Sequence, residues 1–117
     1  NNPLEDKYPN WSPDNSKILF SRVVIGTQDQ VFVMNADGSG QTRLTNNTAS
    51  DWAAVYSPDG AYITFTSNRD GTSNQEVYVM NADGSGQVNL TNSPTSNDRY
   101  PHWTRFSNWL FLPLIIR

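Results

Sequence analysis

The sequence contains no cysteine and few basic residues, and both shortages exclude classes of function. Without cysteine, the 117-residue chain can form no disulfide, no thiolate metal site and no cysteine nucleophile. Its eight Lys and Arg residues are scattered between Lys7 and Arg117, and the net charge is −3. No basic stripe is present to neutralise a phosphate backbone, so we expect no nucleic-acid partner. The single histidine, His102, has no carboxylate cluster beside it in the sequence, so we expect no metal, no cofactor and no catalytic site.

Long apolar runs are also scarce. The longest, residues 109–116, covers about half of a membrane span and is interrupted by Pro113. We therefore expect no membrane insertion. The sequence starts Asn-Asn-Pro-Leu-Glu-Asp, without the basic stretch and apolar run of a signal peptide, so we expect no signal peptide within it. The mean hydropathy of −0.62 and the many Asn, Ser, Thr, Asp and Gly residues favour β-structure with short connections.

An internal repeat is the strongest signal in the sequence. Residues 31–46 recur at 77–92, and only three of the sixteen positions differ. Upstream, Trp-Ser-Pro-Asp-Asn at 11–15 corresponds to Tyr-Ser-Pro-Asp-Gly at 56–60, and a third copy begins near Trp103. The period of 45 to 47 residues is typical of a four-stranded propeller blade.

Each period contains four strand-like runs separated by turn residues. Pro-Asp-Asn or Pro-Asp-Gly joins the first run to the second, where Asn or Gly can adopt a positive φ, and Asp-Gly-Ser-Gly joins the third to the fourth. The third run is apolar on both faces, since Val31 alternates with Phe32, which indicates a sheet covered on both sides. The predicted strands are residues 8–12, 17–23, 30–35, 62–67 and 76–81, with short fourth strands that end at 44–45 and 90–91.

A four-stranded sheet with two apolar faces needs neighbours, and radial stacking of such sheets gives a β-propeller. We therefore predict an all-β fold made of antiparallel four-stranded blades, with a two-sheet sandwich as the alternative. The whole of residues 1–117 would form a partial propeller that oligomerisation completes. Its blades would lie at about 8–45 and 53–91, with a partial third blade at about 99–116.

These motifs together resemble the repeat of the TolB-type β-propeller family. The resemblance rests on Trp-Ser-Pro-Asp-Gly, Ile-x-Phe, Val-Tyr-Val-Met-Asn-Ala-Asp-Gly-Ser-Gly and Leu-Thr-Asn, and it covers nearly all of residues 8–104. It implies a periplasmic or secreted propeller similar to a scaffold module. Because no catalytic motif is present, we expect a non-enzymatic module whose partners are other copies of itself or another protein. Related propellers are attached to peptidases and to oligogalacturonate lyase, so the alternative is a propeller fragment of a hydrolase or polysaccharide lyase with a sugar- or peptide-binding rim.

Loop lengths indicate where a ligand would bind. Between the two repeats, the connection from the second to the third strand and the connection from one blade to the next each grow by one residue. Both connections lie at the same end of an antiparallel meander, and loops on a rigid scaffold often carry recognition. The alternative is that these are merely solvated polar loops. The candidate binding residues at this end are Asp51, Trp52, Asn68, Arg69, Asp70, Asn97, Asp98 and Arg99.

The C-terminal segment departs from the repeat. After Trp103 the expected Ser-Pro-Asp-Gly is replaced by Thr-Arg-Phe-Ser, and a frameshift in the encoding DNA would explain the break. The tail is strongly apolar, so we expect self-association. Three chains of two blades would give a six-bladed ring, and two chains that share partial blades would give five. The predicted interface residues are Trp109, Leu110, Phe111, Leu112, Leu114, Ile115 and Ile116.

Overall fold

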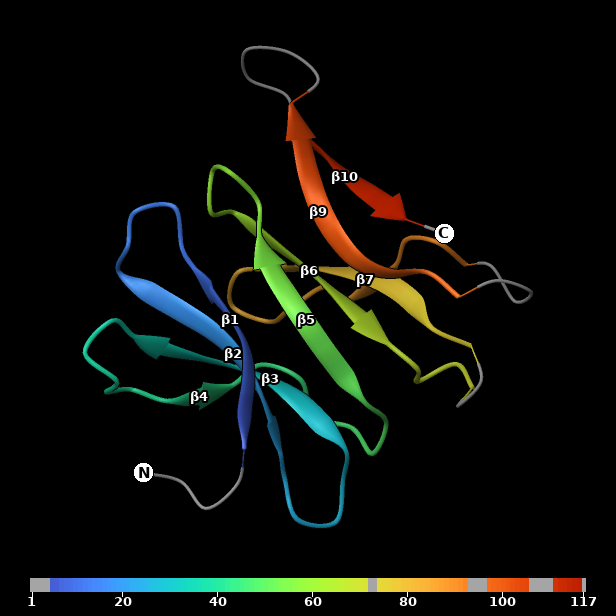
Figure 1. Cartoon of the computed structure of the whole chain (residues 1–117), viewed down its shortest axis with the longest axis horizontal. Coiled ribbons are helices and arrows are strands. Elements are labelled where there is room, and N and C mark those ends of the chain that lie inside the picture. The colour runs from blue at the N-terminus through green and yellow to red at the C-terminus, as the bar shows by residue number, and fades with distance from the viewer. Residues whose placement is uncertain (1–4, 72–73, 93–96, 106–110, 117) are drawn as a thin grey trace.

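The computed structural model of the chain describes residues 5–71, 74–92, 97–105 and 111–116. The regular elements within these ranges are all strands, and they form three antiparallel sheets (Figure 1). The first sheet has the order β1 (Asp6–Trp11), β2 (Lys17–Val23), β3 (Asp29–Asn35), β4 (Thr42–Arg43). The second has the order β5 (Asp51–Tyr56), β6 (Tyr62–Ser67), β7 (Glu76–Asn81), β8 (Val88–Asn89). The third pairs β9 (Arg99–Arg105) with β10 (Phe111–Ile116).

This architecture confirms the predicted fold class. The strands that begin each sheet lie next to one another near the middle of Figure 1, where β5 contacts both β1 and β9. The fourth strands β4 and β8 are only two residues long, because Gly-containing turns precede them and the chain leaves each sheet shortly afterwards. Within the described ranges there is no helix, and therefore none long and apolar enough to cross a membrane.

The turn between the first and second strands has the backbone that its sequence predicts. Asn15 and Gly60 occupy the same turn position in the two sheets and have φ angles of 61° and 75°. In the first sheet, the carboxylate of Asp14 accepts hydrogen bonds from the Ser12 hydroxyl (2.7 Å) and the Ser16 amide (3.0 Å). These local bonds satisfy the turn without help from the rest of the fold.

A β-bulge interrupts the first strand of every sheet at the same repeat position. In the first two sheets, the two residues that follow Lys7 and Trp52 face one residue of the neighbouring strand, and Tyr8 and Ala53 have positive φ angles of 53° and 55°. In the third sheet the register shifts between Leu114 and Ile116 in the same way. A bulge bends the strand and increases its twist, which suits strands that converge on a common centre.

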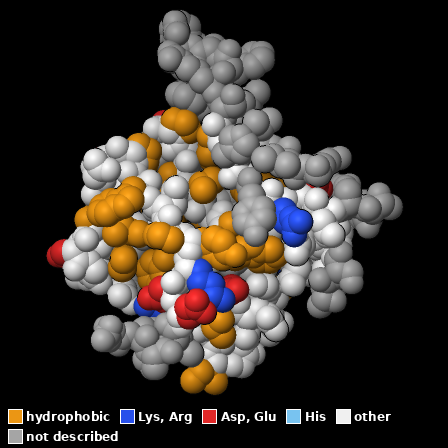
Figure 2. All heavy atoms as spheres, in the orientation of Figure 1, with side chains coloured by type: hydrophobic (Ala, Val, Ile, Leu, Met, Phe, Trp, Pro, Cys, Tyr) orange, Lys and Arg blue, Asp and Glu red, His pale blue; other side chains and the backbone are white. Residues whose placement is uncertain are grey.

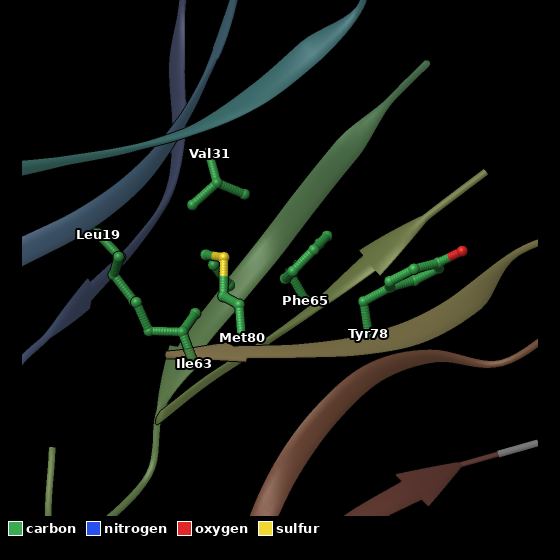
Figure 3. Close-up of a cluster of buried hydrophobic side chains, with 7 residues drawn as sticks. Leu19, Val31, Ile63, Phe65, Tyr78 and Met80 are labelled. Carbon is green, nitrogen blue, oxygen red and sulfur yellow. The ribbon is translucent and has the colours of Figure 1, made fainter. Parts of the chain in front are cut away.

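The hydrophobic core lies in the seam, which we define as the contact between the first and second sheets. Leu19 and Val31 point from the first sheet toward Ile63, Phe65 and Met80 of the second (Figure 3). All five side chains are buried. Burial of such residues stabilises a fold by about 1.5–3 kcal/mol each, so the two sheets stabilise one another.

The third sheet preserves a hairpin where the sequence leaves the repeat. Trp103 pairs with Pro113, ten residues later, whereas Trp11 pairs with Ile18 and Tyr56 with Ile63, seven residues later. The connection is thus longer by three residues, although strand pairing continues. Of the predicted interface residues, Phe111, Leu112, Leu114, Ile115 and Ile116 lie on β10, and Trp109 and Leu110 lie outside the described residues.

Candidate functional site

The two ends of the sheets carry different connections. At one end lie the turns between β1 and β2 and between β3 and β4, together with their counterparts in the second sheet. At the other end lie the β2–β3 and β6–β7 loops and the connections from one sheet to the next. We call this second end the loop rim. Ser50 and Asn68 join two of its loops, because the Ser50 amide donates to the Asn68 side chain (2.8 Å) and the Asn68 amide donates to the Ser50 carbonyl (3.1 Å).

An ion pair holds the centre of the loop rim in the second sheet. Arg69 Nη2 lies 3.2 Å from Asp51 Oδ2, and the Asp51 side chain is fully buried. Asn47 donates to the same carboxylate oxygen (2.6 Å), while Arg69 also donates to Gln87 (2.9 Å) and Ser67 (3.0 Å). A buried charge is tolerated when it is paired and hydrogen-bonded, so this network holds the Asp51 and Arg69 side chains in place.

The guanidinium group of Arg69 also covers the aromatic pair below it. Its central carbon lies 4.4 Å from the ring centroid of Tyr78 and 5.4 Å from that of Phe65. The two rings are stacked with centroids 5.7 Å apart. Cation–π contacts of this kind add to the ion pair.

The first sheet carries the same arrangement, which sequence reasoning missed. Arg22 pairs with both carboxylate oxygens of Asp6 (2.6 and 2.9 Å), donates to Gln41 (3.0 Å), and stacks over Phe20 and Phe32. The acid and the glutamine recur one repeat later as Asp51 and Gln87, which is a signal in the sequence. The two arginines escape a repeat alignment because Arg22 lies within β2 and Arg69 lies in the loop after β6.

Asp70 lies at the hydroxyl end of Tyr78. It accepts hydrogen bonds from the Tyr78 hydroxyl and from Asn89 (3.0 Å). Burial raises the pKa of Tyr78, and the hydrogen bond to Asp70 and the negative charge of Asp70 raise it further, to about 12. These groups line a hollow of about 540 Å³, whose other lining residues are Asn74, Glu76, Val88 and Asn92.

The remaining candidate residues lie elsewhere on the loop rim. Asn97 and Asp98 contact Gln75 in the β6–β7 loop, through its amide (2.9 Å) and its carbonyl (2.7 Å) respectively. Asp98 is buried and Arg99 is exposed at the start of β9. Trp52 is partly buried on β5. The structure therefore groups Asp51, Asn68 and Arg69 around one pair of loops and places Asn97 and Asp98 against another part of the β6–β7 loop.

The repeated Leu-Thr-Asn motif has a structural role at the loop rim. The hydroxyl of Thr45 accepts a hydrogen bond from the Val31 amide (2.9 Å) and donates to Gln30 (3.1 Å). Thr91 repeats both contacts, with the Val77 amide (3.1 Å) and with Glu76. The threonine thus fastens the end of each sheet to the start of its third strand.

The opposite end of the sheets has a larger hollow that the sequence did not indicate. It has a volume of about 580 Å³ and lies between the two sheets, with Lys17, Val33, Leu44 and Tyr56 in its lining. Among the residues that the structure describes, no group of three or more His, Cys, Asp or Glu side chains is placed to hold a metal ion.

Comparison with known proteins identifies the family of this repeat. Residues 3–111 match the TolB beta propeller domain. The chain belongs to the TolB beta-propeller family. The solved structure of a putative TolB from Agrobacterium tumefaciens superposes with a TM-score of 0.74 and 29% identity over 87% of this chain. TolB from Acinetobacter baumannii shares the fold, with a TM-score of 0.70 and 24% identity over 93% of this chain.

This TolB-type chain is much shorter than its relatives. An uncharacterized protein of Agrobacterium fabrum is 37% identical over 71 residues, which are 58% of this chain and 23% of that protein. The match covers 35% of the Agrobacterium tumefaciens structure and 29% of the Acinetobacter baumannii structure. The chain therefore spans about a quarter to a third of the length of these proteins.

Proposed function

We propose that this chain is a non-enzymatic protein-interaction module that associates with further copies of itself to complete a propeller ring. The other partner class is a second protein, which would bind at the loop rim. By family resemblance, this chain works in the periplasm or outside the cell.

One observation carries the self-association. Large hydrophobic side chains lie at the surface of the sheets, with Trp11 52% and Val88 56% exposed, although the repeat buries equivalent faces between sheets. Hydrophobic side chains lie in several patches on the side of the molecule shown in Figure 2, and charged groups there are few. Contact with another copy would remove these surfaces from water.

Light scattering over a range of protein concentrations tests this proposal. We expect the mass-average molecular weight to rise with concentration and to reach a fixed multiple of the 13.2 kDa chain when a ring closes. A constant mass of one chain from micromolar to millimolar concentration would overturn the self-association.

A second candidate function is a sugar- or peptide-binding rim, and the hollow beside Asp70 supports it. The side-chain amides of Asn74, Asn89 and Asn92 and the phenol of Tyr78 share this hollow with the carboxylate of Asp70. Such groups can donate and accept several hydrogen bonds to a polyhydroxyl ligand. This candidate predicts binding in a screen of glycans that includes oligogalacturonides, and loss of binding in Asp70→Ala. A silent screen favours the protein-interaction module.

A further inference from the structure

The first sheet has a rear face, defined here as the face that points away from the second sheet. Leu19 and Val31 enter the seam, and side chains alternate along a strand. Ile18, Phe20, Phe32 and Met34 therefore lie on the opposite face, and Phe20 stacks on Phe32 with ring centroids 5.6 Å apart. Trp11 pairs with Ile18 at the edge of this rear face, where it also borders a hollow lined by Val55 and Tyr56. It is the counterpart of Tyr56, which packs against the core of the seam.

The corresponding face of the second sheet shows what covers this set of side chains. There the counterparts Ile63, Phe65, Tyr78 and Met80 are buried in the seam. The first sheet covers them with Leu19, Val31, Val33 and Leu44. On the second sheet, this set of side chains therefore forms an interface with another sheet. On the first sheet the set is a less buried surface, since Ile18, Phe32 and Met34 are only partly buried and Phe20 alone is buried.

The arginine that covers the aromatic pair in the seam, together with its acid and glutamine partners, has a counterpart on the rear face. In the seam, Arg69 covers Phe65 and Tyr78 and binds Asp51 and Gln87. On the rear face, Arg22 makes the same contacts with its own aromatic pair, acid and glutamine, and its side chain is only 12% exposed. Because these contacts already exist in the single chain, little side-chain ordering remains to oppose docking.

We propose that the rear face of the first sheet is a docking site for the C-terminal sheet, β9–β10, of a second copy. This proposal rests on the proposed self-association and names the two surfaces that it joins. Within the described residues, β5 lies next to β1 and β9 lies next to β5, so each sheet packs on the one before it in the chain, and the third sheet packs on the second. Placing it before β1 of another copy repeats the order of sheets in the seam.

This contact is heterologous, because it joins two different surfaces of the same chain. Heterologous contacts close into a ring when the rotation between copies permits it and otherwise continue as an open filament. The propeller arrangement of the sheets provides a rotation about the centre, so we expect a closed ring.

Hydroxyl-radical footprinting of the unmodified chain tests the docking face directly. Trp11 is 52% exposed and Tyr62, on the second sheet, is 46% exposed. As concentration rises and the chain associates, oxidation of Trp11 should fall several-fold while oxidation of Tyr62 stays near its starting value. An associated chain whose Trp11 remains as reactive as in the single copy would overturn the docking face and leave the self-association standing.

A pair of substitutions gives an independent measurement. Trp11→Glu places a charge on the rear face, and Ile25→Glu places one in the β2–β3 loop, where Ile25 is 89% exposed. Sedimentation should show self-association weakened roughly tenfold or more by Trp11→Glu, and unchanged by Ile25→Glu. Equal association of both variants would overturn this docking site. A wild-type chain that stays monomeric would instead overturn both this site and the proposed function, and if Trp11→Glu does not fold, the footprint of the unmodified chain decides.

Discussion

The ion pair between Asp51 and Arg69 has a fully buried acid, and its counterpart in the first sheet provides a control. Asp51→Asn removes the charge that Arg69 and Asn47 share, and we expect a loss of about 1–3 kcal/mol in the free energy of unfolding. Asp6→Asn breaks a pair whose acid is 41% exposed, so its expected cost is about 0–1 kcal/mol. Urea unfolding of both variants measures the difference. Equal losses in the free energy of unfolding would show that burial does not determine how much the Asp51–Arg69 pair contributes to stability.

The turn acid Asp14 makes stability depend on pH. Hydrogen bonds from Ser12 and Ser16 lower its pKa from 3.8 to about 2. Because the folded-state pKa is lowered, the stabilisation is complete above about pH 4 and disappears as the pH falls through about 2. NMR titration of the Asp14 carboxylate should show this low pKa, and Ser12→Ala should move it back toward 3.8. An Asp14 that titrates near 3.8 in the unmodified chain would contradict the turn geometry.

At the scale of elements, the two Asp-Gly-Ser-Gly turns have the same backbone and different surroundings. Gly38 and Gly84 have φ angles of 88° and 90°, so alanine at either position costs about 1–2 kcal/mol in backbone strain. An added Cβ at Gly84 would lie 3.0 Å from the Leu44 carbonyl oxygen of the first sheet, whereas at Gly38 nothing lies within 4 Å. We therefore expect Gly84→Ala to be more destabilising than Gly38→Ala.

Thermal or urea unfolding of the two alanine variants measures the difference. The excess cost of Gly84→Ala reports how closely the second sheet packs against the end of the first. Equal destabilisation in a dilute, monomeric sample would contradict this close packing.

The strands themselves were largely predictable, because alternation and turn residues are local signals. The bounds of β2, β6 and β7 agree with the prediction, and β3 begins one residue earlier. The first strand of the first repeat was placed too late, because residues 8–12 were predicted and β1 begins at Asp6. Its early residues are polar and it contains a bulge, and a bulge breaks the alternation from which a strand is recognised.

At the scale of the whole molecule, the stability of one sheet depends on the next. Ile63 is buried in the seam, and its counterpart Ile18 is only partly buried on the rear face. Ile63→Ala should cost about 2–5 kcal/mol because it opens a cavity between the two sheets. Ile18→Ala should cost about 1–2 kcal/mol, since its side chain is partly in water already.

Calorimetry at a concentration where the chain is monomeric separates the two cases. Equal costs there would mean that the first sheet is covered on its rear face within the single chain. At concentrations where the chain associates, the cost of Ile18→Ala should rise toward that of Ile63→Ala.

The candidate site was less predictable than the fold. Loop lengths singled out the loop rim, and Asp51, Asn68 and Arg69 do lie together there. The pairing of Arg22 with Asp6 could not be read from the repeat, because a long arginine side chain reaches the same point from two different backbone positions. The binding role of the loop rim stays a prediction.

The sequence by itself determined the repeat, the turn types and the antiparallel blade, because strand alternation and positive-φ turn positions depend on neighbouring residues. Only the tertiary structure decided which aromatic face is buried in the seam and which is less buried, although the two sets of side chains are nearly identical. Whether a face is covered depends on the sheet beside it. Tyr78 is buried and Phe32 is only partly buried because their neighbours differ, although both are aromatic residues at the same repeat position.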